Sequence, residues 1–155
     1  AVLESRLLAG DQDHQGRPHL ADYRSLMTRF RWAYISMSAE GLTEVLAPGF
    51  KWNLHYFNAE DPRPTGRVLN GVDEMIQELA WRKKNWARTR YGFLAERFAP
   101  NLVTQSFRMS AINVEDGKPF KVDAVDLYDV VDGRILTKST YWKHLKPDPP
   151  EERLV

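Results

Sequence analysis

The residues best suited to acid–base chemistry lie on a stretch, residues 122–131, that alternates between apolar and polar side chains. If Asp126 faces a cavity, it shares that face with apolar neighbours, because side chains two apart on a strand point the same way. A carboxylate among apolar groups has a raised pKa, which suits a general acid or base near neutral pH. We therefore expect Asp126 to move a proton on a bound ketone or enol, with Tyr128 or Tyr34 as hydrogen-bond donor. The structural alternative is that Asp126 pairs with a lysine or arginine across a sheet.

His55 is a further candidate for proton transfer, because histidine titrates near neutral pH and His55 alone among the histidines lies within an expected core strand. Strict alternation places it on the face opposite Trp52, which favours an exposed or interface position. A bulge near Asn58 or Pro62 would reverse that placement. The remaining histidines are His14, His19 and His144. The four have neither metal-ligand spacing nor clustered carboxylates nearby, so we expect no metal and no cofactor.

A mostly apolar wall with a few polar points is expected to bind the substrate. A pocket for a flat polycyclic or aromatic molecule needs such a wall, although an ordinary core needs the same residue types. The residues assigned to this wall are Trp52, Gln105, Phe107, Met109, Thr140 and Trp142. Three basic residues, Arg82, Lys83 and Lys84, either attract an anionic substrate to the pocket mouth or form a solvated helix end.

Three helices are predicted in the first half of the chain by apolar residues that recur every three or four positions. The first begins near His19, and Ser38 is expected to cap a second, short helix that stops at Pro48-Gly49. The third opens with Asn70 or Gly71 as its cap. The first helix buries Leu20, Tyr23, Met27, Phe30, Tyr34 and Met37, and the third buries Val72, Met75, Ile76 and Leu79.

Alternating segments rich in β-branched and aromatic residues predict the strands that position these groups. Asp-Gly pairs at Asp116-Gly117 and Asp132-Gly133 predict hairpins between long strands, and the second hairpin is expected at the middle of a strongly curved sheet. Helices followed by an antiparallel meander make an α+β domain. The predicted strands are residues 50–56, a short one around 68–69, and residues 89–98, 102–112, 120–131 and 134–144.

The composition indicates one globular domain of 155 residues, with 43% hydrophobic residues and no cysteine. The domain is expected over residues 19–146, between an N-terminal arm, residues 1–18, and a C-terminal tail, residues 147–155. A net charge of +1 suggests neither nucleic acid nor an anionic membrane as a partner. No apolar run approaches the roughly 20 residues that span a bilayer. We expect a cytoplasmic location.

Two motifs carry a resemblance to a known family: Gly66 with the segment Asn70-Gly71-Val72-Asp73-Glu74-Met75-Ile76, and the segment from Asp126 to Ile135. Together with the element order, they make residues 22–144 resemble the SnoaL-like branch of the nuclear transport factor 2-like (NTF2-like) superfamily. This resemblance implies a cone-shaped α+β fold, in which three helices pack on a curved, mainly antiparallel sheet around a deep pocket. It also implies a homodimer formed through the convex sheet face.

The resemblance does not carry over the catalytic groups of three related activities. The last-strand carboxylate of polyketide cyclases and epoxide hydrolases falls on Thr140, and the cyclase histidine falls on Asp126. The Arg and Asp of the epoxide hydrolases fall on Phe107 and Met109. The Tyr and Asp of ketosteroid isomerases fall on Phe30 and Leu54. Apolar residues neither transfer protons nor orient water, so these activities are not transferred.

Three hypotheses remain at this point. The first is a cofactor-free enzyme that isomerises, dehydrates or cyclises a small hydrophobic carbonyl compound, with Asp126 as acid or base. The second is a non-catalytic ligand-binding or dimerisation domain of the same fold. The third is a structural partner subunit that associates through polar and aromatic residues of the outer sheet face. The residues expected at that contact are Arg108, Ser110, Lys121, Asp123, Ser139 and Tyr141.

Overall fold

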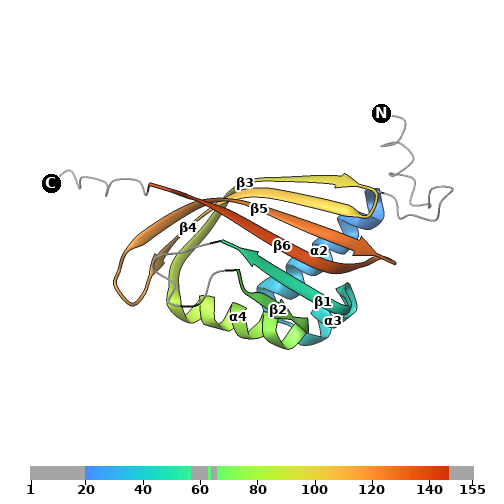
Figure 1. The fold of residues 1–155 in the computed structure, drawn as a ribbon, viewed down its shortest axis with the longest axis horizontal. Coiled ribbons are helices and arrows are strands. Elements are labelled where there is room, and N and C mark those ends of the chain that lie inside the picture. Colours follow the sequence, from blue (N-terminus) through green and yellow to red (C-terminus); the bar gives the residue numbers. More distant parts are fainter. Residues whose placement is uncertain (1–19, 57–62, 64–65, 147–155) are drawn as a thin grey trace.

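The computed structural model describes residues 20–56, 63 and 66–146. Three helices lie against a six-stranded, strongly curved sheet that stays open (Figure 1). The α+β, cone-shaped architecture expected from the sequence is therefore confirmed. The expected arm and tail, with His14 and His19, fall outside the described residues.

The helices follow the predicted apolar periodicity, and their ends have local causes. The Ser38 hydroxyl accepts a hydrogen bond from the Gly41 N–H at 3.0 Å and caps α3 as expected. The Asn70 side chain makes no capping bond, but the Glu74 carboxylate accepts from the Asn70 backbone N–H. The helices are α2 (Leu20–Ser36), α3 (Ala39–Val45) and α4 (Gly71–Asn85).

The sheet has the strand order β2-β1-β6-β5-β4-β3, so the last hairpin does lie at its centre. Neighbouring strands are antiparallel except β1 and β6, which run parallel. The turn between β5 and β6 has positive φ at both Asp132 (51°) and Gly133 (73°), which suits a tight hairpin turn. The strands are β1 (Leu46–His55), β2 (Val68–Asn70), β3 (Trp86–Ala99), β4 (Leu102–Asn113), β5 (Pro119–Val131) and β6 (Arg134–Leu145).

The predicted end of the second helix is wrong: the helix ends at Val45 and not at Pro48-Gly49. Leu46 already pairs with Ile135 of β6, so the chain changes to strand before the proline. The register then shifts between Leu46 and Lys51. This irregular segment accommodates Pro48 and the positive φ of Gly49 within the strand.

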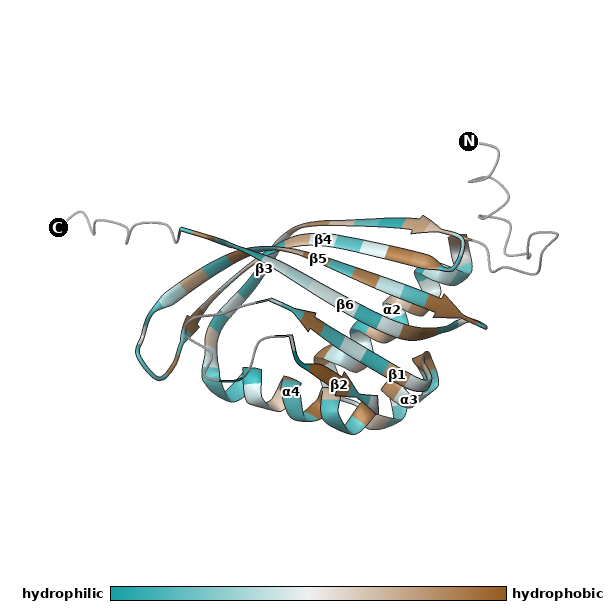
Figure 2. Cartoon of the chain, in the orientation of Figure 1, coloured by the Kyte–Doolittle hydropathy of each residue, from teal (hydrophilic) through white to brown (hydrophobic). Residues whose placement is uncertain are grey.

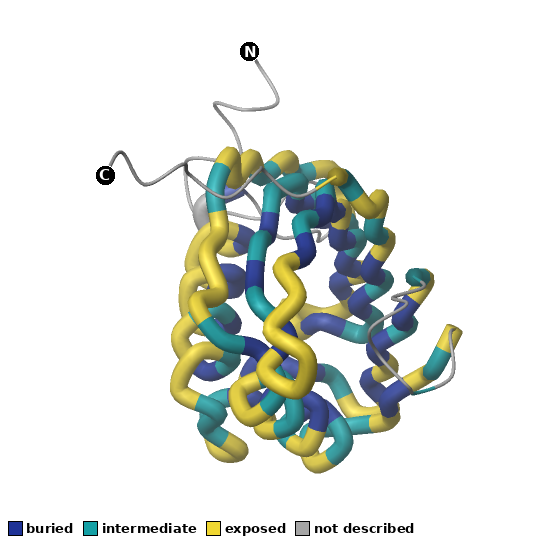
Figure 3. The backbone as a smooth tube through the Cα atoms, turned by 90° about the vertical axis from the view of Figure 1, so that its left-hand side faces the viewer, coloured by how far each residue is buried: buried dark blue, intermediate teal, exposed yellow. Residues whose placement is uncertain are grey.

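The inner face of the sheet and the helix stripes form the core. Figure 2 shows the alternation of hydrophobic and hydrophilic positions along the strands. Figure 3 shows buried segments inside and exposed ones on the outside. A large cluster joins α2, α3, α4 and β1. A smaller one at the other end of the sheet contains Trp86, Met109, Ala111, Phe120 and Val122. Between the two clusters, the face of β5 turns inward with Asp126 on it.

Within the part of the chain that the structure describes, no helix is long and apolar enough to cross a membrane.

Candidate functional site

A cavity of about 500 Å³ lies between α2, α4 and the concave face of the sheet. Its volume falls in the range of sites for small molecules. Its wall is mostly apolar and aromatic, and its polar groups come from the central strands and from the ends of two helices. The lining residues are Phe30, Arg31, Tyr34, Ile35, Met37, Trp52, Leu79, Arg82, Lys83, Trp86, Thr89, Tyr91, Leu94, Gln105, Phe107, Met109, Asp126, Tyr128, Lys138, Thr140 and Trp142.

The polar centre of this cavity is an ion pair between Asp126 of β5 and Lys138 of β6. Lys138 Nζ lies 2.6 Å from Asp126 Oδ2, and both side chains are at most 5% exposed. The Thr140 hydroxyl donates to Asp126 Oδ1 at 2.6 Å. The expected cross-sheet pairing of Asp126 is thus confirmed, whereas its expected apolar surroundings are interrupted by Lys138. Both partners line the cavity, so the pair faces any molecule held there.

The pairing of the two strands explains this geometry. Asp126 lies opposite Thr140, and Tyr128 lies opposite Lys138, in the antiparallel ladder of β5 and β6. Opposite and diagonal residues of such a ladder share one face of the sheet. The four polar groups therefore meet on the concave side.

A chain of hydrogen bonds extends from the ion pair across the cavity floor. Lys138 Nζ donates to the Tyr128 hydroxyl at 3.1 Å, and that hydroxyl donates to Gln105 Oε1 at 2.9 Å. Gln105 Nε2 donates to Glu96 at 2.8 Å, and Arg31 pairs with Glu96 at 3.0 Å. The network fixes the rotamers of its buried members and reaches from the cavity floor to α2.

On the opposite side of the ion pair, the Trp52 indole N–H donates to the Thr140 hydroxyl at 2.8 Å. This bond turns the hydroxyl proton toward Asp126. Thr140 therefore fixes the orientation of the carboxylate.

Burial changes the proton affinities of the central groups. It lowers the pKa of the Lys138 ammonium; Asp126 opposes this effect, and Arg82 adds to it. Burial also raises the pKa of the Tyr128 hydroxyl well above its ordinary value, and the charge of Asp126 raises it further. The pKa of Tyr34 is raised by burial as well, although Arg82 opposes this. Both tyrosines therefore remain protonated at neutral pH and can donate hydrogen bonds.

Tyr34 differs from Tyr128 in its hydrogen bonding. Its ring packs against Phe30 and Trp52, with centroid distances of 5.6 and 6.0 Å, and lies 5.8 Å from Lys138 Nζ. Within residues 20–56, 63 and 66–146, its hydroxyl has no hydrogen-bond partner. A protonated hydroxyl in this position is available to a bound molecule.

A second charged centre borders the cavity at the end of α4. Glu78, which is buried, accepts hydrogen bonds from Arg63, Arg67 and Arg82. Burial alone would raise the pKa of Glu78, but Arg82 and Arg63 more than offset this and lower it. Arg82 also donates to the Tyr56 hydroxyl at 2.8 Å.

The Arg82 guanidinium is surrounded by the aromatic wall. Its central carbon lies 4.8, 4.9 and 5.6 Å from the ring centroids of Trp52, Trp86 and Trp142. Such cation–π contacts hold the guanidinium in place beside the cavity.

The structure brings nearly all of the sequence-predicted site residues to this cavity. Among the acid–base candidates, Asp126, Tyr128 and Tyr34 line it. So do all residues assigned to the binding wall, namely Trp52, Gln105, Phe107, Met109, Thr140 and Trp142. The assignment of roles to these residues stays a prediction.

His55 is the exception among the candidates. It lies at the end of β1 on the outer face, exposed, and stacks on Tyr141 at 4.7 Å between ring centroids. The strand alternates from Phe50 to His55, which places His55 on the face opposite Trp52. The bulge considered near Asn58 or Pro62 falls outside the described residues. A molecule in the cavity does not meet its imidazole, so its expected role as a proton shuttle is abandoned.

Lys138 is the main site residue that the sequence reasoning missed. It lies two residues before Thr140 and four before Trp142, so the period of a strand places all three on one face. Because Thr140 belongs to the expected binding wall, the same alternation places Lys138 on that wall as well. The sequence indicates Arg82 as either an attractor of anionic substrate or part of a solvated helix end. It does not predict the low exposure of the Arg82 side chain, which depends on Glu78, Trp86 and the distant Trp52 and Trp142.

The described residues contain no group of three or more His, Cys, Asp or Glu side chains that could hold a metal ion. The chemistry available at the site is that of one carboxylate with two amines, two guanidinium groups and three phenols; these residues are Asp126, Lys83, Lys138, Arg31, Arg82, Tyr34, Tyr91 and Tyr128. These groups can polarise a carbonyl oxygen, stabilise an oxyanion and transfer a proton.

No protein-family model and no curated protein matches the chain. Solved structures do match over most of its length. An NTF2-like protein from Burkholderia thailandensis E264 has 17% identity and a TM-score of 0.63, with 77% of this chain and 88% of that one covered.

Two further solved structures show the same likeness. A putative SnoaL-like polyketide cyclase from Jannaschia sp. CCS1 has 13% identity and a TM-score of 0.58, over 76% of this chain and 84% of that one. A protein with a ketosteroid isomerase-like fold from Catenulispora acidiphila DSM 44928, in complex with trimethylamine, has 15% identity and a TM-score of 0.59. That match covers 75% of this chain and 83% of that one.

The chain therefore has the NTF2-like fold, the fold of SnoaL-like and ketosteroid isomerase-like proteins. At these identities the likeness defines the fold, and the activity has to be argued from the site.

Proposed function

We propose that this protein binds a small, mostly apolar carbonyl compound in its cavity and transfers a proton on it without a cofactor. The observation that carries the proposal is the buried Asp126–Lys138 pair, which lines an otherwise largely apolar cavity. A buried ion pair is weak as a source of stability, because desolvation offsets much of the attraction. Perturbed charged groups in a cleft are, in contrast, typical of functional sites.

The roles of the residues follow from their free hydrogen-bonding capacity. An ammonium has three N–H donors; the described residues provide acceptors for two from Lys138, at Asp126 and Tyr128. The remaining donor and the Tyr34 hydroxyl are assigned to the carbonyl oxygen of the bound molecule. Both would stabilise the negative charge that develops on this oxygen when an adjacent carbon loses its proton.

Asp126 is assigned the role of base. Its Oδ1 accepts one hydrogen bond, from Thr140, while Oδ2 accepts one from Lys138. A carboxylate oxygen has two lone pairs, so Oδ1 retains one for a substrate proton. The proton taken from carbon can return at another position of the enolate, which is an isomerisation, or leave together with a hydroxyl group, which is a dehydration.

The trimethylamine of the Catenulispora protein is not a guide to the ligand here. Trimethylamine is protonated at neutral pH, and a cation is repelled by Lys138 and Arg82, which both line this cavity.

Deuterium exchange tests the proposed activity. The probe is 2-tetralone, a flat bicyclic ketone with acidic protons beside its carbonyl, followed by NMR in D₂O. Exchange above the buffer rate is expected with the wild-type protein, and Asp126→Asn should lower the protein-dependent rate by about 10²-fold or more. Binding of the ketone with exchange only at the buffer rate would contradict catalysis and support the non-catalytic alternative.

We also propose a homodimer that forms through the convex sheet face. Val125 and Tyr141, a directly opposed pair on the two central strands, are 41% and 44% exposed on that face. Beside them, Arg108 pairs with Asp123 at 2.8 Å. An apolar centre with charges of both signs around it is suited to a self-complementary contact.

A further inference from the structure

Basic residues outnumber acidic residues in the lining of the cavity. Four basic residues line it, Arg31, Arg82, Lys83 and Lys138, against one acidic residue, Asp126. The carboxylates that pair with Arg31 and Arg82 are those of Glu96 and Glu78, which lie outside the lining. A bound molecule therefore meets a positive field in surroundings of low dielectric constant, where charge interactions are strong.

Arg82, which lines the cavity, has N–H donors that no described residue uses. A guanidinium has five N–H donors. The described residues accept two hydrogen bonds from Arg82, at Glu78 and Tyr56. Lys83, the next residue on α4, is exposed, lines the cavity and forms no ion pair with any described residue. Together they form a cationic edge where the cavity meets the end of α4.

The cationic edge and the Asp126–Lys138 pair lie within reach of a single small molecule. Arg82 lies 4.8 Å, and Lys138 Nζ 5.1 Å, from the centroid of the same Trp52 ring. Because both cations lie beside one ring and both line the cavity, a bicyclic molecule held there is long enough to reach both. The two cations need different acceptors, because Lys138 already has a carboxylate as partner, whereas Arg82, which lines the cavity, keeps N–H donors that no described residue accepts.

We propose that the ligand is an organic acid: an aromatic or alicyclic carboxylate whose carboxylate group binds Arg82 and Lys83. Its carbonyl oxygen then lies at Lys138 and Tyr34. This inference rests on the proposed function, because it names the charge class of the molecule that the cavity holds. A carboxylate fits a guanidinium especially well, since two parallel N–H···O bonds can form.

The test compares an anionic and a neutral probe of the same shape, and it includes a bicyclic ketone as the third probe. The probes are 2-naphthoate, 2-naphthamide and 2-tetralone, and binding is followed by calorimetry with the full chain. For the wild-type protein we expect 2-naphthoate to bind about tenfold or more tightly than 2-naphthamide. The reason is that only the carboxylate forms charge-assisted hydrogen bonds with the cationic edge, and one such bond is enough for a tenfold difference in affinity.

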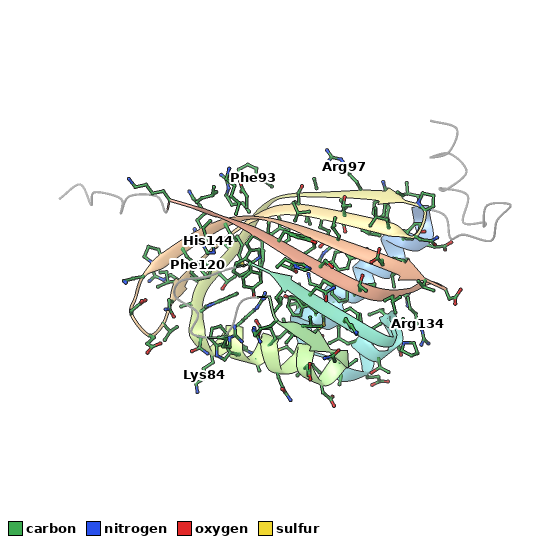
Figure 4. The ribbon with its side chains drawn as sticks, in the orientation of Figure 1. Lys84, Phe93, Arg97, Phe120, Arg134 and His144 are labelled. Carbon is green, nitrogen blue, oxygen red and sulfur yellow. The ribbon has the colours of Figure 1, made fainter. Side chains whose placement is uncertain are left out.

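Two neighbouring residues offer a matched pair of variants. Lys83→Glu reverses a charge that lines the cavity, while Lys84→Glu makes the same change at an exposed neighbour outside the lining. Figure 4 shows Lys84 pointing away from the body of the protein. We expect Lys83→Glu to lower the affinity for 2-naphthoate several-fold and to leave the affinity for 2-naphthamide unchanged. Lys84→Glu should leave both affinities unchanged.

The possible failures are distinguishable. Equal or tighter binding of 2-naphthamide, or equal losses in the two variants, would overturn the acid site while leaving the apolar cavity site intact. Binding of none of the three probes would overturn the proposed function as well. Arg82→Gln is the less suitable variant, because it removes a partner of the buried Glu78 and threatens folding.

Discussion

Lys138 Nζ and Asp126 Oδ2 lie 2.6 Å apart at the floor of the cavity, and the two residues come from the central strands of the sheet. This pair joins the fold to the proposed chemistry. The hairpin that holds the sheet together also brings an amine and a carboxylate to its concave side.

Replacing Lys138 by Met should destabilise the protein by about 3–5 kcal/mol, because it leaves the buried charge of Asp126 without its partner. The free energy of unfolding is measured by urea denaturation. The double variant Asp126→Asn with Lys138→Met should be more stable than the sum of the two single losses predicts. Strictly additive losses would show that the two side chains do not interact.

The two cavity tyrosines should respond differently to removal of their hydroxyl groups. Tyr128→Phe should lower the free energy of unfolding by about 1–3 kcal/mol, since Gln105 and Lys138 lose a buried partner. Tyr34→Phe should change it by less than about 0.5 kcal/mol, because no described residue bonds to that hydroxyl. Tyr34→Phe should nevertheless weaken binding of 2-tetralone in calorimetry. An unchanged affinity would remove Tyr34 from the site.

Glu78 should make stability depend on pH in the acidic range. Its folded-state pKa lies below the ordinary value of 4.5 because of Arg82 and Arg63, whose effect exceeds that of burial. The stability that it contributes is therefore fully present above pH 4.5 and is lost as the pH falls through the folded-state pKa. Urea midpoints measured between about pH 6 and about pH 3 should fall more steeply for the wild-type protein than for Glu78→Gln.

Glu115→Gln serves as the control for this titration, because Glu115 is an exposed carboxylate in the turn after β4. Its pH profile should match that of the wild type. The same acid slope in Glu78→Gln would place the responsible carboxylate elsewhere.

The proposed dimer should depend on the centre of the convex face. Tyr141→Glu introduces a charge there and should convert a dimer to a monomer in light scattering at micromolar concentration. Val114→Glu adds the same charge at an exposed position beyond the end of β4 and should leave the dimer intact. A wild-type protein that is monomeric at this concentration would refute the dimer.

Local patterns in the sequence predict most of this fold. The Asp-Gly pair at Asp132-Gly133 and the alternation of residues 122–131 place the central hairpin, and Ser38 marks the start of α3 correctly. The same alternation assigns Asp126 and Tyr128 to one face, and the alternation of residues 50–56 places His55 on the face opposite Trp52. These predictions succeed because side-chain direction along a strand is a local property.

The remaining features depend on contacts between residues far apart in the chain. The end of α3 is set by pairing of Leu46 with Ile135, about ninety positions away, so the helix-breaking Pro48 predicts it wrongly. Likewise, Arg82 contacts Trp52 and Trp142, 30 and 60 positions away, only once the chain has folded. Exposed apolar residues such as Phe93, which points outward from β3 in Figure 4, also break the simple pattern of a buried strand face.

A crystal structure of the protein with 2-tetralone bound tests the central claim most directly. We expect the ketone in the cavity, with its carbonyl oxygen at hydrogen-bond distance, about 2.7–3.2 Å, from Lys138 Nζ and the Tyr34 hydroxyl. A ketone bound in the cavity with its oxygen directed away from both groups, or bound outside the cavity, would contradict the account.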